Sequence, residues 1–157
     1  MKKVLTLLIT LFLGMQFGTA QSDVEEIDFL QSVIGAEKKS VVADFIKVDP
    51  AAQDEFWKLY DAYEAERKDL GKQRISLLKK YAEEYEGITP EMTDALLSKS
   101  QKIRNSSNKL LDSYHKKIRK VAGAKAAAQF YQLERYFQSA VNMELYNNIP
   151  LIGELDN

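Results

Sequence analysis

Residues 49–87, DPAAQDEFWKLYDAYEAERKDLGKQRISLLKKYAEEYEG, decide the fold of this chain. Asp49 is a favoured N-cap, Pro50 suits the first helical position, and Gly87 is a plausible C-cap. Between them, apolar side chains recur at steps of three and four residues, which is the spacing of one face of an α-helix. The stretch therefore predicts one helix over residues 50–86, about 55 Å long at ~1.5 Å per residue. The positions of the stripe are Phe56, Leu59, Tyr60, Tyr63, Leu70, Leu77, Leu78, Tyr81 and Tyr85, with Arg67 and Arg74 among them.

The residues that follow predict a second long helix over residues 90–121. Thr89 is its expected cap, Pro90 opens it, and Glu91 complements the helix dipole. Asn105-Ser106-Ser107-Asn108 is the expected position of a bend, because this stretch is polar. Since about three residues join the two helices, they are expected to run antiparallel as a hairpin.

Two further helices complete the predicted architecture. A break at Ala122-Gly123 precedes a helix over residues 124–148. That helix is expected to end there because Ile149 precedes Pro150, and residues 149–157 form an extended tail. Ahead of the long hairpin, a weaker periodic pattern predicts a first helix over residues 26–47. No alternation of the strand type competes, so the predicted class is all-α, with four helices in a single domain over residues 21–157.

The first twenty residues have the pattern of a secretory signal peptide. Lys2 and Lys3 precede an apolar run over residues 4–17, and Gly18-Thr19-Ala20 provides small residues for cleavage before Gln21. The alternative is a retained membrane anchor, but a run of about 14 residues is short for the ~20 that span a bilayer. The sequence thus predicts an exported protein, located in the periplasm if the source is a Gram-negative bacterium.

The composition gives little support to catalysis. The chain has no cysteine and one histidine, His115, which stands beside Lys116 and Lys117. Thiolate chemistry and multi-histidine metal centres are therefore excluded, and a lone histidine among lysines is more typical of a surface than of a catalyst. No phosphate-binding loop, nucleophile elbow or metalloprotease motif is present. We expect no enzymatic activity, no cofactor and no metal site.

Charge is near balance overall, with 22 basic and 23 acidic residues, but it is segregated along the chain. Residues 23–66 hold twelve acids and four bases, whereas residues 99–120 hold eight bases and one acid, Asp112. One interpretation is a basic surface for an acidic partner, such as an unfolded protein, an anionic envelope component or a regulatory domain. The other is that the basic segment complements the acidic one, within the fold or across a dimer. Nucleic acid fits poorly with an exported, net acidic chain.

Aromatic residues are the other unusual group. Members of the stripe are expected in the core, whereas Trp57 lies off the stripe. Long thin helices have a limited interior, so some aromatic surface is expected to remain for a partner subunit or a client protein.

Two motifs resemble a family of small exported bacterial proteins related to Spy and CpxP. The first is Phe56-Trp57-x-x-Tyr60-x-x-Tyr63-x-x-x-Arg67, and the second runs from Lys125 through Gln129-Phe130-Tyr131-Gln132-Leu133-Glu134 to Ile149-Pro150-Leu151. The resemblance covers most of residues 37–152 and implies a four-helix, cradle-shaped, dimeric periplasmic chaperone or stress accessory protein that needs no ATP. The family's Leu-Thr-x-x-Gln motif is altered: Val48-Asp49-Pro50-Ala51-Ala52 and Val121-Ala122-Gly123-Ala124-Lys125 stand in its two places, as in a divergent branch.

These observations, with the resemblance, predict an exported, non-catalytic binding protein: an ATP-independent chaperone for partly unfolded envelope proteins or an envelope-stress accessory protein. A regulatory protein that docks on the periplasmic domain of a stress or metal sensor is the alternative. The resemblance implies a homodimer, and no nucleic acid or stable membrane anchor is expected after processing. The predicted contacts with the client or partner are Phe56, Trp57, Tyr60, Lys102, Arg104, Lys109, Lys116 and Arg119.

Overall fold

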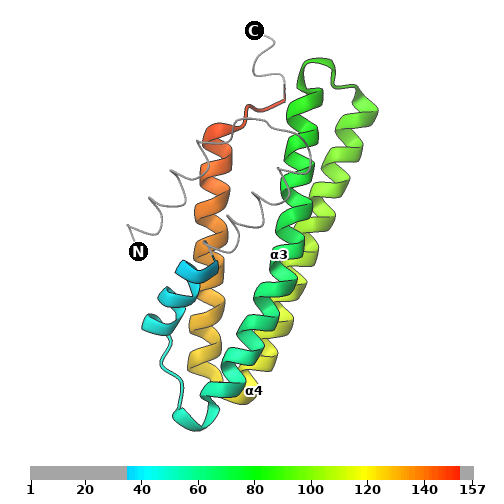
Figure 1. Ribbon diagram of the computed structural model, residues 1–157. Helices are drawn as coiled ribbons and strands as arrows, with labels where there is room; N and C mark the ends of the chain where they lie inside the picture. Colours follow the sequence, from blue (N-terminus) through cyan, green and yellow to red (C-terminus); the bar gives the residue numbers. More distant parts are fainter. Residues whose placement is uncertain (1–34, 153–157) are drawn as a thin grey trace.

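The computed structural model describes residues 35–152, and all the regular secondary structure in this range is helical (Figure 1). The elements are a helix over residues 35–45, a 3-10 turn η1 (Pro50–Ala52), α3 (Gln53–Glu84), a 3-10 turn η2 (Tyr85–Gly87) and α4 (Pro90–Asn148). The predicted all-α class is confirmed. The predicted signal peptide, residues 26–34 of the predicted first helix and residues 153–157 of the predicted tail lie outside the described residues.

The start of α3 follows from the local sequence. The side chain of Asp49 accepts a hydrogen bond from the backbone N–H of Ala51 at 2.9 Å, and Pro50 opens the 3-10 turn that leads into the helix. Asp54 and Glu55 lie in the first turn of α3, where the N–H groups at the helix start favour negative charge. At the other end the chain tightens into η2, and Gly87 has no left-handed conformation, so it is not the C-cap that the sequence suggested.

α4 begins as its sequence predicts and continues further than expected. Thr89 accepts a hydrogen bond from the backbone N–H of Met92 at 3.3 Å, with Pro90 in the first turn. The bend expected at residues 105–108 does not occur, because α-helix continues through them. Ser107 donates its hydroxyl hydrogen bond to the carbonyl oxygen of Ile103 at 3.0 Å, which satisfies this polar side chain inside the helix.

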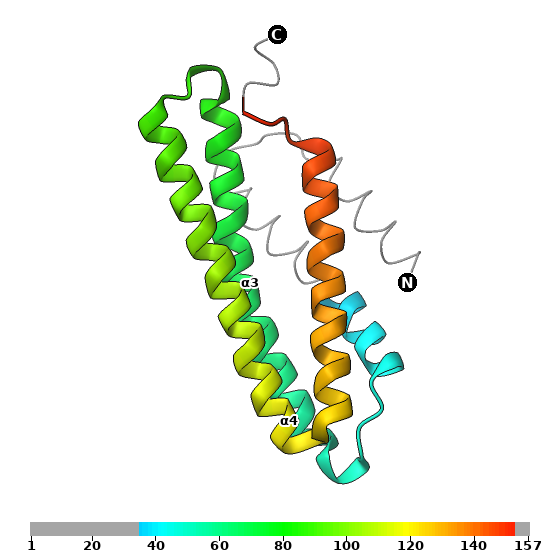
Figure 2. The ribbon, with the colours of Figure 1, turned by 180° about the vertical axis from the view of Figure 1, so that it is seen from behind.

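Gly123 produces the reversal of chain direction that the sequence assigned to a break between two helices. Its φ of 83° and ψ of 172° lie in a region that is essentially restricted to glycine, and it is the one non-helical position inside α4. The segment before Gly123 runs down against α3, and the segment after it runs back up (Figures 1 and 2). The described residues therefore form three α-helices rather than four, with a sharp kink in the last.

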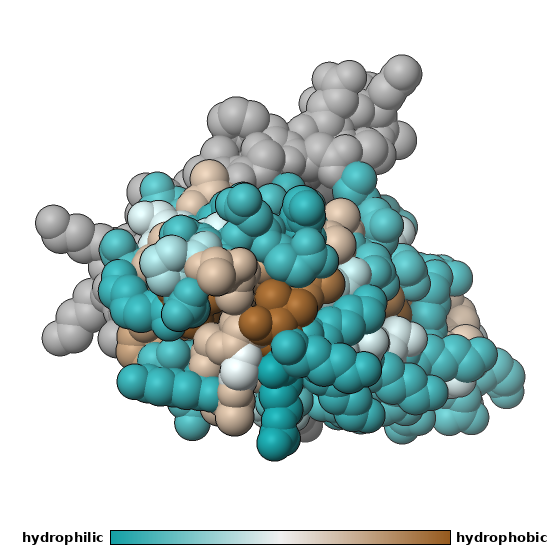
Figure 3. Space-filling model, turned by 90° about the horizontal axis from the view of Figure 1, so that it is seen from below, coloured by the Kyte–Doolittle hydropathy of each residue, from teal (hydrophilic) through white to brown (hydrophobic). Residues whose placement is uncertain are grey.

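The lower end of the molecule in Figure 1, which we call the base, is where these elements meet. The turn over residues 46–52, the start of α3 and the kink at Gly123 lie there, and the helix over residues 35–45 packs beside the second half of α4. Seen from below, the base has a small group of hydrophobic residues at its centre, surrounded by hydrophilic ones (Figure 3).

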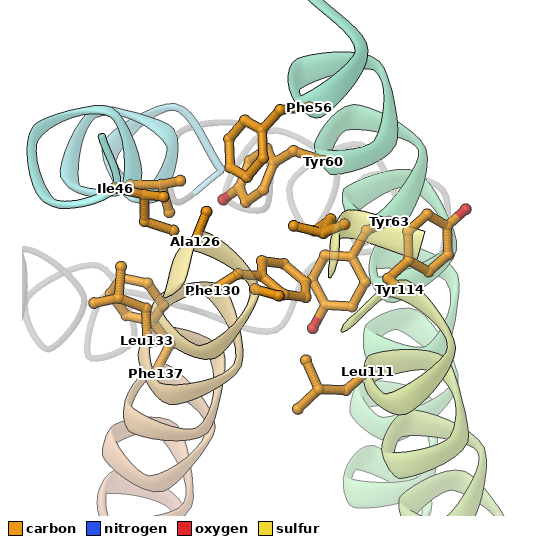
Figure 4. Close-up of a cluster of buried hydrophobic side chains, with 13 residues drawn as sticks. Ile46, Phe56, Tyr60, Tyr63, Leu111, Tyr114, Ala126, Phe130, Leu133 and Phe137 are labelled. Carbon is orange, nitrogen blue, oxygen red and sulfur yellow. The ribbon is translucent and has the colours of Figure 1, made fainter. Parts of the chain in front are cut away.

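One hydrophobic core lies just above the base (Figure 4). Aromatic rings from α3 and α4 meet edge to face: the Tyr63 ring lies 5.1 Å from Phe130 and 5.6 Å from Tyr114, between centroids. The core joins all three helices, and its members are Val42, Ile46, Phe56, Tyr60, Tyr63, Leu111, Tyr114, Ile118, Ala126, Ala127, Phe130, Leu133 and Phe137.

Candidate functional site

Two of the three aromatic residues predicted to contact a client are buried. Phe56 and Tyr60 are 0% exposed, and the Tyr60 ring lies 6.3 Å from the Phe130 ring of α4. They face inward because the second half of α4 returns along this side of α3. The assignment of these two residues to a binding surface was wrong, although their positions on the apolar stripe had indicated a core role.

Trp57 lies at the edge of the core. It is half-buried and packs edge to face against Phe56 at 5.1 Å and Tyr60 at 5.5 Å. The ammonium of Lys39 lies 5.2 Å from the centroid of its ring and also pairs with Asp61. Much of the indole is thus occupied by contacts within the chain, and little of it remains for a partner.

The predicted basic residues are all exposed on the first half of α4. Lys102, Lys109 and Lys116 are spaced by seven residues, so they lie along one face of the helix. Ile103 and Leu111 are buried on the other side of the helix. The other cations of this segment are also exposed: Lys99, Arg104, Lys117, Arg119 and Lys120. We call these eight residues the basic face.

No member of the basic face forms an ion pair within the part of the chain that the structure describes. One member has a different contact: the ammonium of Lys117 lies 3.9 Å from the centroid of the Tyr114 ring. Glu66 of the acidic region does reach α4, but it accepts a hydrogen bond from the Tyr114 hydroxyl at 2.7 Å instead of pairing with a base. The described acidic residues therefore do not neutralise the basic face within the chain.

A buried group of charges, not predicted from the sequence, ties the three helices together. Lys38 donates to Glu64 of α3 at 2.7 Å and to Glu134 of α4 at 2.9 Å, with only 4% of its surface exposed. Arg67 donates to both oxygens of Glu64 at 2.9 and 3.0 Å, and the Tyr63 hydroxyl donates to Glu134 at 2.9 Å. We call these five residues the ionic cluster; it contains two positive and two negative charges.

The electrostatics of the ionic cluster favour the ionised form of Glu64 and the neutral form of the Tyr63 hydroxyl. Burial alone would raise the pKa of Glu64, but the charges of Lys38 and Arg67 and their hydrogen bonds outweigh it and hold that pKa below its usual value. Burial, together with the carboxylate of Glu134, raises the pKa of the Tyr63 hydroxyl well above its usual value. The sequence held one signal of this site: Glu64 and Arg67 fall next to or on the apolar stripe of their helix, where a charged side chain needs a partner.

A second surface feature is apolar and lies on the other half of α4. Tyr136, Met143 and Tyr146 are 45%, 62% and 71% exposed. Their spacing of seven and three residues places them on one side of the helix. We call these three residues the apolar patch. None of these three residues was among the contacts predicted from the sequence.

Polar contacts from α3 and η2 hold the chain close to the apolar patch. Arg74 donates to the side chain of Asn142 at 2.8 Å. The hydroxyls of Tyr81 and Tyr85 donate to the backbone oxygens of Pro150 and Leu151 at 2.9 and 2.8 Å. These two tyrosines, assigned to the core by their spacing, thus fix the path of the chain after α4.

Neither a shallow groove beside α3 nor the single histidine brings together a set of catalytic groups. A shallow groove of ≈ 460 Å³ between α3 and the first half of α4 is lined by polar and basic residues with Ala95 and Ile103. The half-buried His115 packs edge to face on Tyr131, with 5.6 Å between ring centroids. Over residues 35–152 no group of three or more potential metal ligands is gathered, and no helix has the length and apolarity required to cross a bilayer.

No family model, curated protein or solved structure matches this chain.

Proposed function

We propose that this protein is an exported, non-catalytic binding protein that holds partly unfolded envelope proteins without using ATP. The observation that carries the proposal is the apolar patch, three large apolar side chains exposed within eleven positions of one helix. Exposed apolar surface is a frequent mark of a protein-binding site. Tyrosine supplies a large amphipathic surface, and methionine adapts its shape to varied partners, so the composition suits a binding protein of broad specificity.

The resemblance to the Spy and CpxP family supports the setting of this activity. It suggests a cradle-shaped homodimer in the periplasm, reached through the signal peptide over residues 1–20. Export is tested by the N-terminal sequence of the protein recovered from the periplasm, which is expected to begin at Gln21. Self-association is tested by sedimentation equilibrium, with a mass of two chains as the expected result.

The contacts proposed for the client differ from those suggested by the sequence. Phe56 and Tyr60 are core residues, and the apolar patch replaces them as the apolar contact. The basic residues Lys102, Arg104, Lys109, Lys116 and Arg119 lie on the other half of α4, where they attract acidic segments of a client without contributing apolar contacts.

Light scattering from an aggregating model client tests the proposal. The wild-type chain is expected to suppress aggregation at stoichiometric amounts, and Tyr136→Ser/Met143→Ser/Tyr146→Ser is expected to lose most of that suppression. A matched control replaces two large apolar residues exposed elsewhere, in Phe45→Ser/Leu97→Ser, and is expected to keep it. Equal suppression by all three proteins, or none by the wild type, would contradict the proposal.

A regulatory role is the second candidate, and the small size of the apolar patch favours it. Three side chains on one helix match a single helix or groove of a specific partner, such as the periplasmic domain of a stress or metal sensor, as readily as they match varied clients. Capture of one envelope protein that depends on the apolar patch, with no effect on model clients, would support this role over the chaperone role.

A further inference from the structure

The basic face consists of positive charges without acidic partners on one unbroken helical segment. Its eight cations lie between Lys99 and Lys120, in the part of α4 that precedes the kink and has helical geometry throughout. At ~1.5 Å per residue the row extends about 32 Å along the helix. All eight side chains are exposed, and none has an acidic partner within residues 35–152.

This arrangement is unfavourable to the helix itself. Lys116 and Lys120 are four residues apart, while Lys99 and Lys102, and Lys117 and Lys120, are three apart. Like charges at these spacings repel each other on a helix surface. Asp112, the one acid of this segment, lies three residues after Lys109 and four before Lys116 but forms no ion pair with either, so anions from outside would relieve most of this repulsion.

The chemistry between the cations indicates what kind of anion fits. The exposed residues among them include Asn105, Ser106 and Ser113, and no large apolar side chain is exposed between residues 99 and 120. The apolar side of this helix, including Leu111 and Ile118, is buried in the core. The basic face therefore makes charge contacts alone and cannot insert into a bilayer. An unfolded polypeptide requires apolar contacts as well, and those lie on the other half of α4.

We propose that the basic face docks the protein peripherally on an anionic phospholipid surface through the phosphate headgroups. A long row of lysines without apolar neighbours complements a flat layer of negative charge, in which each lysine contributes separately. This docking leaves the apolar patch free for clients, whereas phosphate headgroups and the acidic segments of a client compete for the basic face.

Sedimentation of the full chain with lipid vesicles tests this docking. One set of vesicles contains phosphatidylglycerol in phosphatidylcholine, and the other contains phosphatidylcholine alone. The apolar segment over residues 4–17 meets the same hydrocarbon in both sets, so the preference for the anionic set is the readout. We expect tighter binding to the anionic set, lost in 1 M salt, where the screening length falls to ~3 Å.

Charge-reversal variants assign the preference to the basic face. Lys102→Glu/Lys109→Glu/Lys116→Glu is expected to weaken binding to the anionic vesicles by more than about 100-fold, since each lysine near such a surface contributes about fivefold. Lys47→Glu/Lys58→Glu/Lys80→Glu changes the net charge equally at exposed positions outside the basic face and is expected to bind far more tightly than the first variant. Circular dichroism checks that both variants stay helical.

Three results would overturn the proposal. The first is no preference of the wild type for anionic vesicles, and the second is equal weakening by the two triple variants. The third is salt-sensitive binding of soluble polyglutamate, dependent on Lys102, Lys109 and Lys116, without a preference for anionic vesicles, which would make an acidic protein the partner. Aggregation assays contain no lipid, so failure here is distinguishable from failure of the chaperone proposal.

Discussion

The two ends of this helical hairpin are stabilised differently. Near the base, three helices surround one core, and the ionic cluster joins Lys38 to residues of α3 and α4. Toward the tip, the buried apolar residues are Leu77, Ile103 and Leu145, which lie outside that core. Polar contacts there join side chains of α3 and η2 to the end of α4 or to the chain after it.

This difference separates the residues that stabilise the fold from the residues that we propose bind a client. The residues that fix the fold are concentrated near the base, where the second half of α4 covers α3. They are buried and therefore inaccessible to a partner. The apolar patch, by contrast, lies on the second half of α4 above this core, where side chains are exposed. Variants of the two ends should therefore differ in their effects on unfolding and on binding.

The largest expected effect comes from breaking the ionic cluster at the base. Lys38→Met leaves Glu134 buried without its cation, and removal of one partner of a buried pair costs ~3–5 kcal/mol. The neighbouring Lys39→Met breaks an exposed pair with Asp61, which is worth ~1 kcal/mol or less. Urea denaturation of both variants measures the contrast. Equal losses would show that the cluster contributes nothing special, and Lys38→Met/Glu134→Leu should recover part of the lost stability.

A pair of leucine truncations compares the two ends directly. Leu111→Ala removes a fully buried side chain from the core, and Leu77→Ala removes a nearly buried one toward the tip. Truncations of this kind cost ~2–5 kcal/mol, more where the surroundings cannot collapse into the space. We expect Leu111→Ala near the upper limit and Leu77→Ala near the lower, measured as free energies of unfolding; the reverse order would contradict a denser base.

The kink that turns the second half of α4 back along α3 depends on one glycine, Gly123. Gly123→Ala forces an alanine to a φ of 83° and should cost ~1–3 kcal/mol, although there is open space around the added methyl group. Gly87→Ala is the matched control, since its surroundings are equally open and its φ is not positive, so its effect should be neutral or slightly stabilising. Thermal denaturation distinguishes the two, and equal midpoints would show that α4 reverses without strain at residue 123.

Low pH should reduce the free energy of unfolding through Glu64, which lies in the ionic cluster. Its pKa is lowered on folding, so the unfolded chain takes up a proton first as the pH falls. The stability that its ionised form contributes is complete above the ordinary value of 4.5 and is lost as the pH falls through the lower folded value. Unfolding free energies measured from pH 7 to pH 3 should fall less steeply in Glu64→Gln than in the wild type; parallel curves would be the contrary result.

The smallest expected effect concerns the basic face. Lys99→Gln relieves repulsion from Lys102 without removing the base of any described ion pair, and no acid lies three or four residues from Lys99, so it should stabilise the protein by a few tenths of a kcal/mol. The gain should shrink at high salt. Lys80→Gln, which loses a pair with Glu84 at 3.7 Å, should not show this gain.

Much of the fold could be predicted from local sequence, because caps and periodicity act over a few residues. Asp49, Pro50, Thr89 and Pro90 indicated where the helices of the hairpin start, and the excess of basic residues over residues 99–120 indicated the basic face. Periodicity shows which side of a helix is apolar, and it placed Phe56 and Tyr60 on that side. It does not show which distant segment covers that side, so the same two residues could still be predicted as contacts with a client. Lys38 and Glu134 are 96 positions apart, so their pairing has no local signal.

Hydrogen exchange of the protein, alone and with an unfolded client, tests the central claim most directly. That claim is that the core near the base stabilises the fold while the apolar patch binds the client. In the free protein, amides of residues 56–64, 111–118 and 126–134 should exchange more slowly than those of residues 77–84 and 92–103. With the client, new protection should be centred on residues 136–146, and the base should be unchanged. Uniform protection in the free protein, or new protection centred on Phe56 and Tyr60, would contradict this division.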